Sequence, residues 1–317
     1  MSRNANLAIL LIAAALTLTG CQDNAAPVAS PVNLFTQTRE EMLVSTEWLA
    51  KNYIRENILI LHIAKDKQNY DIEHIPNARF VAWDQVSAEV DGIPNELPPY
   101  ETLVNLVQQS GIKQSHRIII YDEEQGLFAA RLYVVLEYIG LSSNAALLDG
   151  QLVKWKAEHL PLSFRPAAIT PSEYTARIEP AVVISHRQMK DIVWSENNLP
   201  QNRISIIDAR PRDQFSGETP GEGIDRPGHI PGAISFFWKN AIESDQNPIL
   251  KPIEQLRIMF QQAGVIKDDL IVTYCRTGGQ ASHAYFLAKY LGYQTRIYDG
   301  SYIQWQRDPE NKITKTE

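Results

Sequence analysis

The clearest indication of chemistry in this 317-residue chain is one cysteine, Cys275, at the end of a short apolar run, Leu270–Tyr274. The residues that follow it are Arg276, Thr277, Gly278, Gly279 and Gln280. A helical pattern begins near Ala281, which puts the cysteine in a tight loop between a strand and a helix N-terminus. Inward-turned N–H groups of such a loop and the positive end of the helix bind anions. We therefore predict that Cys275 is a catalytic nucleophile and that residues 276–280 bind its substrate.

The same loop predicts an activated thiol. Backbone N–H groups, the helix dipole and the guanidinium of Arg276 all favour negative charge on the sulfur. We therefore expect the pKa of Cys275 to lie below the ordinary thiol value of about 8.5. Gly278 and Gly279 permit the backbone angles that such a loop requires. The alternative for a lone cysteine at a strand end is an unreactive core residue.

An internal repeat extends over most of the chain. An apolar run, Ile58–Ile63 in the first half and Ile204–Asp208 in the second, leads to a His-Ile-Pro-X-Ala segment at residues 74–78 and 229–233. A second run, RIIIYD and then LIVTYC, precedes a helical pattern in both halves. We expect the tryptophans at matched positions to lie in the core rather than against a ligand. They are Trp83, Trp155, Trp238 and Trp305.

The repeated elements predict two α/β domains. Apolar runs of this length are typical of strands buried on both faces of a parallel sheet. Residues 128–139 and 281–291 have apolar side chains at helical spacing, and Pro98–Gly111 and Pro252–Gly264 predict further helices. Strands that alternate with helices indicate a parallel sheet flanked by helices in each domain.

Proline-rich sequence separates the two halves between Leu160 and Pro180. We expect a first domain at residues 45–162, a linker at 163–180 and a second domain at 181–312. Two domains are also what the chain length allows.

The segment YCRTGGQAS, followed by a helix and then by IYDG, resembles the active-site region of rhodaneses and mercaptopyruvate sulfurtransferases. Both His-Ile-Pro-X-Ala segments resemble the first signature of this family, and the duplication is similar to its two-domain form. YDGSYIQW resembles the C-terminal signature loosely, because Tyr302 and Gln304 differ from the residues that the family prefers. The resemblance implies two rhodanese-like domains. It also implies that Cys275 takes a sulfane sulfur from a donor, forms a persulfide and passes the sulfur to a thiol or cyanide-like acceptor.

The first domain lacks the nucleophile, because Asp122 lies at the position that matches Cys275. A carboxylate cannot form a persulfide and would repel an anionic donor. We therefore expect the first domain to be a structural partner that helps to form the wall of the cleft.

Further charged residues are expected near the same sheet edge. Asp208 and Arg210 end a strand, and they either support the cleft or form a structural ion pair. Arg212 lies close by and is a further candidate for support of the cleft. His229 is expected to hydrogen-bond within its own loop rather than act as a base, since His74 recurs in the domain without the nucleophile.

The donor pocket departs from both known subtypes of the family. Thr277 lies where thiosulfate-using rhodaneses place a cation, and Arg276-Thr277 lies where mercaptopyruvate enzymes tend to carry Gly-Ser. Gln214 lies where both subtypes place an arginine. Arg276 and the Thr277 hydroxyl can still bind a small anion, so we favour a thiosulfate-like donor over 3-mercaptopyruvate.

Two other functions are compatible with a cysteine in an anion-binding loop. A cysteine phosphatase needs an arginine six positions after the cysteine, where this chain has Ala281, so phosphatase activity is disfavoured. A periplasmic sulfur or selenium carrier would keep the fold without turnover. Steady-state turnover with cyanide, compared with sulfur loading alone, distinguishes a carrier from an enzyme.

The N-terminal residues predict export and a lipid anchor. Residues 1–21 combine a polar start with an apolar run too short to span a bilayer, as in a signal peptide. Leu18-Thr19-Gly20-Cys21 resembles the lipobox of bacterial lipoproteins, which implies lipidation of Cys21. Residues 22–44 are polar and contain proline, as a tether would. The expected location is the cell envelope, facing the periplasm; Gln22 favours the outer membrane by analogy.

Composition and motifs exclude several classes of partner. The net charge of −7 and the absence of a polybasic run argue against nucleic acid. No His/Cys cluster has the spacing of metal ligands, and no nucleotide-binding loop is present, so we predict no metal and no cofactor.

Overall fold

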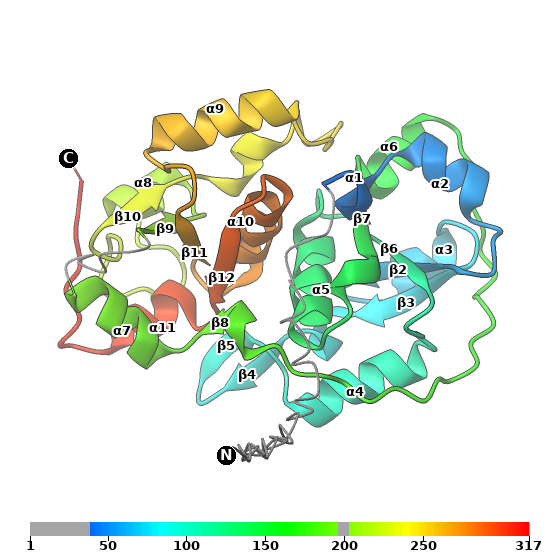
Figure 1. The fold of residues 1–317 in the computed structure, drawn as a ribbon, viewed down its shortest axis with the longest axis horizontal. Coiled ribbons are helices and arrows are strands. Elements are labelled where there is room, and N and C mark those ends of the chain that lie inside the picture. Colours follow the sequence, from blue (N-terminus) through cyan, green and yellow to red (C-terminus); the bar gives the residue numbers. More distant parts are fainter. Residues whose placement is uncertain (1–38, 196–202, 317) are drawn as a thin grey trace, which may run out of the picture. The chain divides into compact units, whose positions relative to one another are not determined.

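The computed structural model describes residues 39–195 and 203–316, which belong to one compact unit with two five-stranded parallel sheets (Figure 1). The predicted signal peptide, Cys21 and residues 22–38 of the predicted tether lie outside the described residues. The prediction of a tether is wrong for residues 39–44, which form a short helix and an edge strand of the first sheet. Within the described part of the chain, no helix combines the length and apolar character needed to cross a membrane.

The first sheet has the strand order β1-β7-β6-β2-β3, and every neighbouring pair is parallel. Its strands are β1 (Leu43–Val44), β2 (Ile58–Ala64), β3 (Ala78–Ala82), β6 (Arg117–Tyr121) and β7 (Ala145–Leu148). The surrounding helices are α1 (Arg39–Met42), α2 (Thr46–Asn52), α3 (Gln68–Ile72), α4 (Tyr100–Gln109), α5 (Leu127–Tyr138) and α6 (Gln151–Ala157), with 3-10 turns η1 (Trp83–Gln85) and η2 (Ser142–Asn144).

The second sheet repeats this topology in the order β8-β12-β11-β9-β10. Its strands are β8 (Val183–Ile184), β9 (Ile204–Asp208), β10 (Ala233–Ser235), β11 (Leu270–Tyr274) and β12 (Gln294–Tyr298). Its helices are α7 (His186–Trp194), α8 (Arg212–Ser216), α9 (Ile253–Ala263), α10 (Gly279–Tyr290) and α11 (Ser301–Arg307), with 3-10 turns η3 (Pro180–Val182) and η4 (Trp238–Ala241). The predicted α/β class with two parallel sheets flanked by helices is confirmed.

Alternating side chains of the central strands explain why both faces of each sheet are covered. Along β6, Ile118 and Ile120 belong to one apolar cluster and Ile119 and Tyr121 to another, because successive side chains point to opposite faces. The first cluster continues through α5 and α10 into the second sheet, where it includes Ile271. One core therefore joins the inner faces of the two sheets.

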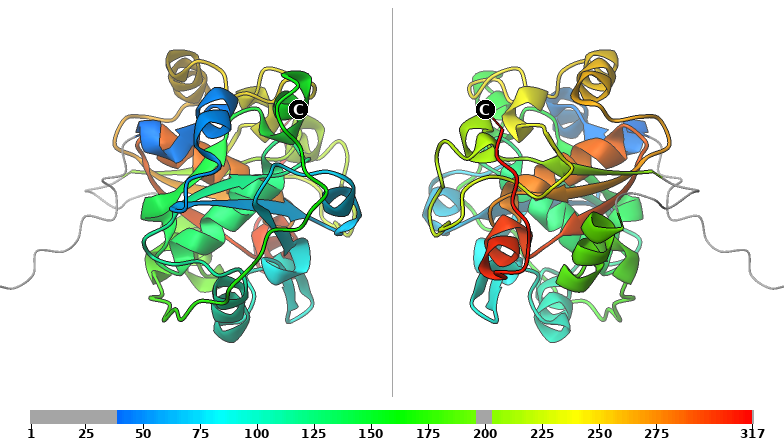
Figure 2. Two further views of the ribbon diagram at one scale, coloured as in Figure 1. Left: turned by 90° about the vertical axis from the view of Figure 1, so that its right-hand side faces the viewer. Right: turned by 90° about the vertical axis from the view of Figure 1, so that its left-hand side faces the viewer.

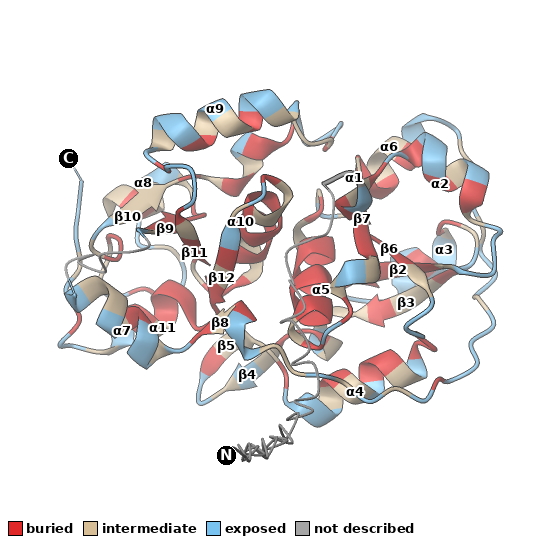
Figure 3. Ribbon diagram, in the orientation of Figure 1, coloured by how far each residue is buried: buried red, intermediate tan, exposed pale blue. Residues whose placement is uncertain are grey.

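Helices α5 and α10 form the centre of this shared core and lie side by side between the sheets (Figures 1 and 3). The rings of Tyr133 and Phe286 meet edge to face, with centroids 5.0 Å apart. Lys289 of α10 forms a 2.7 Å ion pair with Glu137 of α5, and both side chains are buried. Helix α10 starts at the loop of Cys275 (residues 275–280, here called the active loop), so this packing fixes the active loop against the first domain.

The chain between the two sheets runs over the first domain in an extended form. Residues 164–179 contain no helix or strand. The Ser172 N–H donates to the Gln108 carbonyl at 3.0 Å, and the Tyr174 hydroxyl donates to the Ile139 carbonyl at 2.7 Å. The C-terminal segment likewise runs in an extended form along the second domain, where it is red in the right-hand view of Figure 2. Thr314 of this segment forms an antiparallel bridge with His229.

The sequence did not predict the two-stranded hairpin of β4 (Ala88–Val90) and β5 (Ile93–Glu96). Asp91 and Gly92 form its turn with positive φ angles of 51° and 72°. The hairpin belongs to the first domain and extends toward β12 and the loop of Cys275 (Figure 1). It therefore adds residues to the site that no sequence motif indicates.

Candidate active site

The loop of Cys275 connects β11 to α10 and surrounds the sulfur with backbone N–H groups. The Gly278 N–H donates to Cys275 Sγ at 3.1 Å, and the Ser301 hydroxyl accepts the N–H of Cys275 at 3.3 Å. Gly278 has a φ angle of 93°, which a side chain would resist, and its added Cβ would lie 3.3 Å from the carbonyls of Asn95 and Asp299. The predicted strand–loop–helix arrangement therefore holds the sulfur next to the start of α10.

Burial determines the ionisation of this thiol. Cys275 is only 2% exposed, and burial raises its pKa above the ordinary value of a cysteine. The N–H groups of Ala281, Thr277 and Gly278 lower the pKa, but they offset burial only in part. The prediction of a lowered pKa is therefore wrong for this structure, because removal of the sulfur from water outweighs the loop dipoles.

We predict that alkylation of Cys275 by iodoacetamide becomes faster with pH up to a midpoint above about 8.5, the value of an ordinary thiol. The reason is that the reactive thiolate forms only when the pH passes the raised pKa. Peptide mapping assigns the rate to Cys275. The urea-unfolded protein is the control, since its exposed thiol returns to the ordinary midpoint. A midpoint in the folded protein at or below the unfolded value would contradict the assignment to burial.

Arg276 does not direct its charge at the sulfur. Its guanidinium donates to the backbone carbonyl of Glu222 at 2.9 Å and to the Glu222 carboxylate at 3.0 Å. The expectation that Arg276 stabilises the thiolate directly is therefore not met, because its guanidinium pairs with Glu222, which lies in the loop between α8 and β10.

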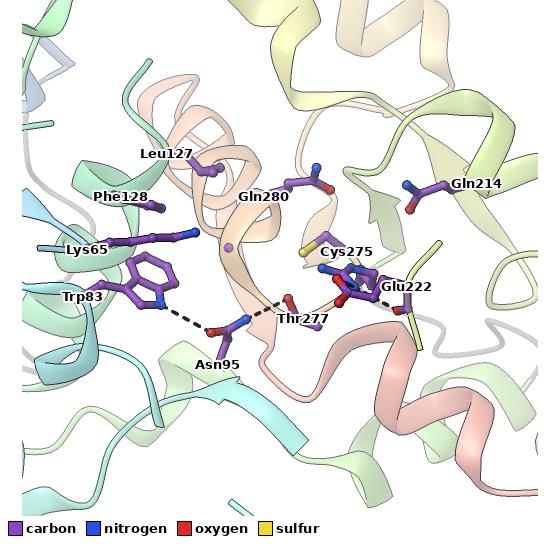
Figure 4. Close-up of a pocket in the computed structure, with 12 residues that line it drawn as sticks. Lys65, Trp83, Asn95, Leu127, Phe128, Gln214, Glu222, Cys275, Thr277 and Gln280 are labelled. Carbon is purple, nitrogen blue, oxygen red and sulfur yellow. Dashed lines mark hydrogen bonds and ion pairs between the residues drawn. The ribbon is translucent and has the colours of Figure 1, made fainter. Parts of the chain in front are cut away.

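Cys275 lies in a pocket of about 540 Å³ between the two domains (Figure 4). The pocket is lined by Lys65, Trp83, Asn95, Leu127, Phe128, Gln214, Glu222, Cys275, Arg276, Thr277, Gly279 and Gln280. Its volume is in the range of small-molecule sites. The first five residues belong to the first domain, and the sequence prediction missed them except as a general cleft wall. Trp83 was predicted to be a core residue; it is half-buried and lines the pocket instead.

A hydrogen-bonded bridge from the hairpin holds the active loop. The side-chain N–H of Asn95 donates to the Thr277 hydroxyl at 3.0 Å, and the side-chain oxygen of Asn95 accepts from the Ser87 hydroxyl at 2.8 Å. Arg131 is fully buried; it donates to the backbone carbonyl of Asn95 at 2.8 Å and to the Asp299 carboxylate at 2.6 Å. The active loop is therefore positioned by both domains.

In the first domain, the loop between β6 and α5 matches the loop of Cys275, and the carboxylate of Asp122 takes the place of the sulfur. Its carboxylate accepts the N–H groups of Glu124, Gly126 and Ala129, each at 2.8 Å. Burial raises the pKa of Asp122 to about 6, although these N–H groups partly offset the effect. Ala129 lies three residues into α5, as Ala281 lies three residues after Gly278. The anion-binding loop of the first domain is therefore filled by its own side chain, which supports a structural role.

The charged residues after β9 are placed in two different environments. Asp208 and Arg210 form a fully buried ion pair at 2.6 Å, and the guanidinium lies 4.1 Å from the ring of Tyr302. This geometry matches the structural ion pair, and neither residue lines the pocket of Cys275. Arg212 belongs to α8 and lines a separate hollow with Lys315, so its expected role as cleft support is wrong.

Both predicted structural histidines hydrogen-bond within their loops. His229 Nδ1 lies 2.8 Å from the Phe215 carbonyl, and His74 Nδ1 lies 2.6 Å from the Tyr70 carbonyl. Each imidazole is stacked on the ring of the same partner, at 3.8 and 3.9 Å between centroids. Their structural role is confirmed, and so is the burial of three of the four repeated tryptophans, Trp155, Trp238 and Trp305.

Comparison with known proteins identifies the fold family. The rhodanese-like domain matches this chain twice, over residues 45–158 and 189–308. The sulfur carrier protein TtuD of Thermus thermophilus is 29% identical over 273 residues, which cover 84% of this chain and 93% of that protein. Human 3-mercaptopyruvate sulfurtransferase is 30% identical over 256 residues, which cover 78% of this chain and 83% of that enzyme. A putative thiosulfate sulfurtransferase of Mycobacterium tuberculosis is 30% identical over 275 residues, with 84% and 95% covered.

Solved structures share the same fold. The crystal structure of YnjE has a TM-score of 0.76 at 20% identity and covers 87% of this chain and 69% of its own. The anaerobic ergothioneine biosynthesis enzyme from Chlorobium limicola has a TM-score of 0.75 at 20% identity, with 89% and 72% covered. The matched relatives, the repeated family match and the loop of Cys275 lead to one conclusion. This chain belongs to the rhodanese-like domain family, carries two such domains and is a sulfurtransferase.

Proposed function

We propose that this protein moves a sulfane sulfur from a small anionic donor to a thiophilic acceptor through a persulfide on Cys275. The observation that carries this proposal is the position of the sulfur: Cys275 Sγ accepts a backbone N–H and lines a pocket between the domains. The N–H groups of the loop favour negative charge at this point, whether it is on the thiolate, the donor or the persulfide.

The reaction consists of two displacements at sulfur. In the first, the Cys275 thiol loses its proton to solvent and the thiolate attacks the outer sulfur of thiosulfate. A new S–S bond forms on Cys275, the S–S bond of thiosulfate breaks, and its electron pair leaves with sulfite. In the second, cyanide attacks the terminal sulfur of the persulfide; thiocyanate leaves and the Cys275 thiolate is restored.

Thiosulfate is the donor that we place before 3-mercaptopyruvate. Thr277 and Gln214 are neutral, so this side of the pocket offers no charged clamp for the carboxylate of 3-mercaptopyruvate. Several relatives that match this chain over 95% of their own length are named putative thiosulfate sulfurtransferases.

Incubation of the purified protein with thiosulfate, followed by mass spectrometry of the intact protein, tests the persulfide. We expect the mass to rise by one sulfur atom on Cys275, and we expect cyanide to remove it. The same measurement with 3-mercaptopyruvate ranks the two donors. A protein that gains no removable sulfur from either donor would exclude this mechanism.

The relative named as a sulfur carrier supports a second function, in which Cys275 holds sulfur for a protein acceptor without turnover of small acceptors. The two functions differ in the second displacement. An enzyme releases thiocyanate continuously when thiosulfate and cyanide are both in excess, whereas a carrier is loaded once and then transfers slowly. A release of one equivalent, with no steady state, would favour the carrier.

We also propose that the mature protein is anchored in the bacterial cell envelope through lipid on Cys21, with its domains in the periplasm. The support is the lipobox-like segment Leu18–Cys21 and the polar tether after it. The site residues all lie after this tether, so the anchor and the chemistry are separate.

Cys21→Ser is expected to prevent lipidation and leave the precursor unprocessed or mislocalised. The measurement is fractionation of cells into membrane and soluble parts, with labelled palmitate to detect the lipid. The purified variant retains wild-type sulfur transfer, because Cys275 is unchanged. Cys275→Ser is the matched control and should stay in the membrane fraction. Equal palmitate labelling of Cys21→Ser and wild type would disprove the anchor.

A further inference from the structure

Two cations line the pocket of Cys275, and they differ in what they bind. Arg276, on the second domain, is engaged with the carbonyl and carboxylate of Glu222. Thr277 and Gln214 add no charge on that side. Lys65 is the other cation, and it comes from the first domain, directly after the last residue of β2, Ala64.

Lys65 extends into the pocket from the wall opposite the cysteine. Figure 4 shows its side chain and the sulfur of Cys275 pointing toward each other across the cavity. Its Nζ lies 6.0 Å from the ring centroid of Phe128, which lines the same wall. The ring of Trp83 packs 4.5 Å from that of Phe128, so two aromatic side chains flank the lysine stem.

Lys65 has no ion-pair partner among residues 39–195 and 203–316. Asp66, Glu123 and Glu124 line an adjoining hollow with it, but none of these carboxylates lies within 4.0 Å of its ammonium group. By contrast, Lys67, two residues later, forms a 2.6 Å ion pair with Asp71 on the surface. The charge of Lys65 is therefore available to an anion that enters the pocket.

An anionic donor needs such a charge here. The chain carries a net charge of −7, which opposes the approach of an anion, and the loop N–H groups supply only partial charges. A full positive charge in a partly enclosed pocket attracts an anion more strongly than it would in bulk water. The interaction strengthens as the displaced sulfite takes the electron pair of the broken S–S bond.

We propose that Lys65 binds the anionic group of the sulfur donor, so that the donor is held between the first domain and the nucleophile of the second. This inference rests on the proposed function, since it assigns a binding group to the same donor. It gives the first domain a direct part in substrate recognition, although its own loop holds Asp122 in place of a nucleophile.

Alkylation of Cys275 by two reagents that differ in charge tests the effect of Lys65 without the need for sulfur transfer. Iodoacetate is an anion and iodoacetamide is its neutral analogue, so the ratio of their rate constants reports attraction of an anion to the pocket. Dividing the two rates also cancels any change in the pKa of Cys275. We expect Lys65→Gln to lower the ratio about tenfold, an effect typical of one partly screened charge. Lys65→Arg should keep most of the ratio, and Lys67→Gln is the control that should not change it.

Sulfur transfer gives the second readout. We expect Lys65→Gln to raise the KM for thiosulfate about tenfold, and added salt to weaken the wild type more than the variant. If the alkylation ratio falls while no donor loads sulfur on Cys275, the anion site stands and the proposed function fails. A ratio within twofold of wild type in a folded Lys65→Gln protein, or a fall only in Arg276→Gln, would overturn the role of Lys65.

Discussion

Replacing Cys275 by serine is expected to reduce sulfur transfer to the uncatalysed rate. A serine hydroxyl cannot form the persulfide, and the first domain holds Asp122 at the equivalent position. The substitution exchanges the sulfur for a smaller oxygen and leaves the backbone of the loop unchanged, so folding should be preserved. Thiocyanate release from thiosulfate and cyanide measures the loss. Thermal unfolding of the variant confirms that the protein is folded.

Asp122→Ala is the matched substitution in the first domain. Sulfur transfer should stay within a few-fold of wild type, because Asp122 holds its own loop and is not among the residues that line the pocket. Its removal leaves the buried N–H groups of Gly126 and Ala129 without an acceptor, so a loss of stability is expected. Asp122→Asn retains an acceptor and should be less destabilising. Loss of activity in a folded Asp122→Asn protein would mean that the first domain takes part in the chemistry through this loop.

Arg131→Met is expected to destabilise the protein by about 3–5 kcal/mol, because it leaves the buried carboxylate of Asp299 without its partner. For a chain of this size, that corresponds to a fall of roughly 5–10 °C in Tm. The change also removes the hydrogen bond to the Asn95 carbonyl, and Asn95 holds Thr277 of the active loop. We therefore expect sulfur transfer to decrease as well.

Unfolding in urea measures this loss of stability. Lys51→Met is the control: it removes an ion pair with Glu47 whose two side chains are 70% and 76% exposed, and it should leave the stability nearly unchanged. Adding Asp299→Asn to Arg131→Met should recover part of the stability, since the buried charge is then removed. Equal stability of Arg131→Met and Lys51→Met would show that the buried pair does not join the domains.

The sequence was sufficient to predict the repeated elements and to single out Cys275 as the candidate nucleophile, because both depend on local patterns. Strand β9 was predicted with its exact bounds from one β-branched run, and α5 and α10 from apolar spacing followed by glycine. Cys275 was identified because strand, glycine-rich loop and helix are consecutive in the chain. Comparison of the two halves of the sequence placed Asp122 at the position that matches Cys275, and the structure has its carboxylate in the matching loop.

Only the tertiary structure decided the surroundings of the sulfur. Lys65 and Asn95 lie 210 and 180 residues before Cys275 in sequence, and no pattern in the chain indicates that they line its pocket. Glu222 pairs with Arg276 through a loop that carries no motif, so the guanidinium that the sequence assigned to the thiolate has a carboxylate as its partner instead. The ionisation of Cys275 depends on how completely α10 and the first domain exclude water. Burial is a property of the packed molecule, so the direction of this pKa could not be predicted from the loop alone.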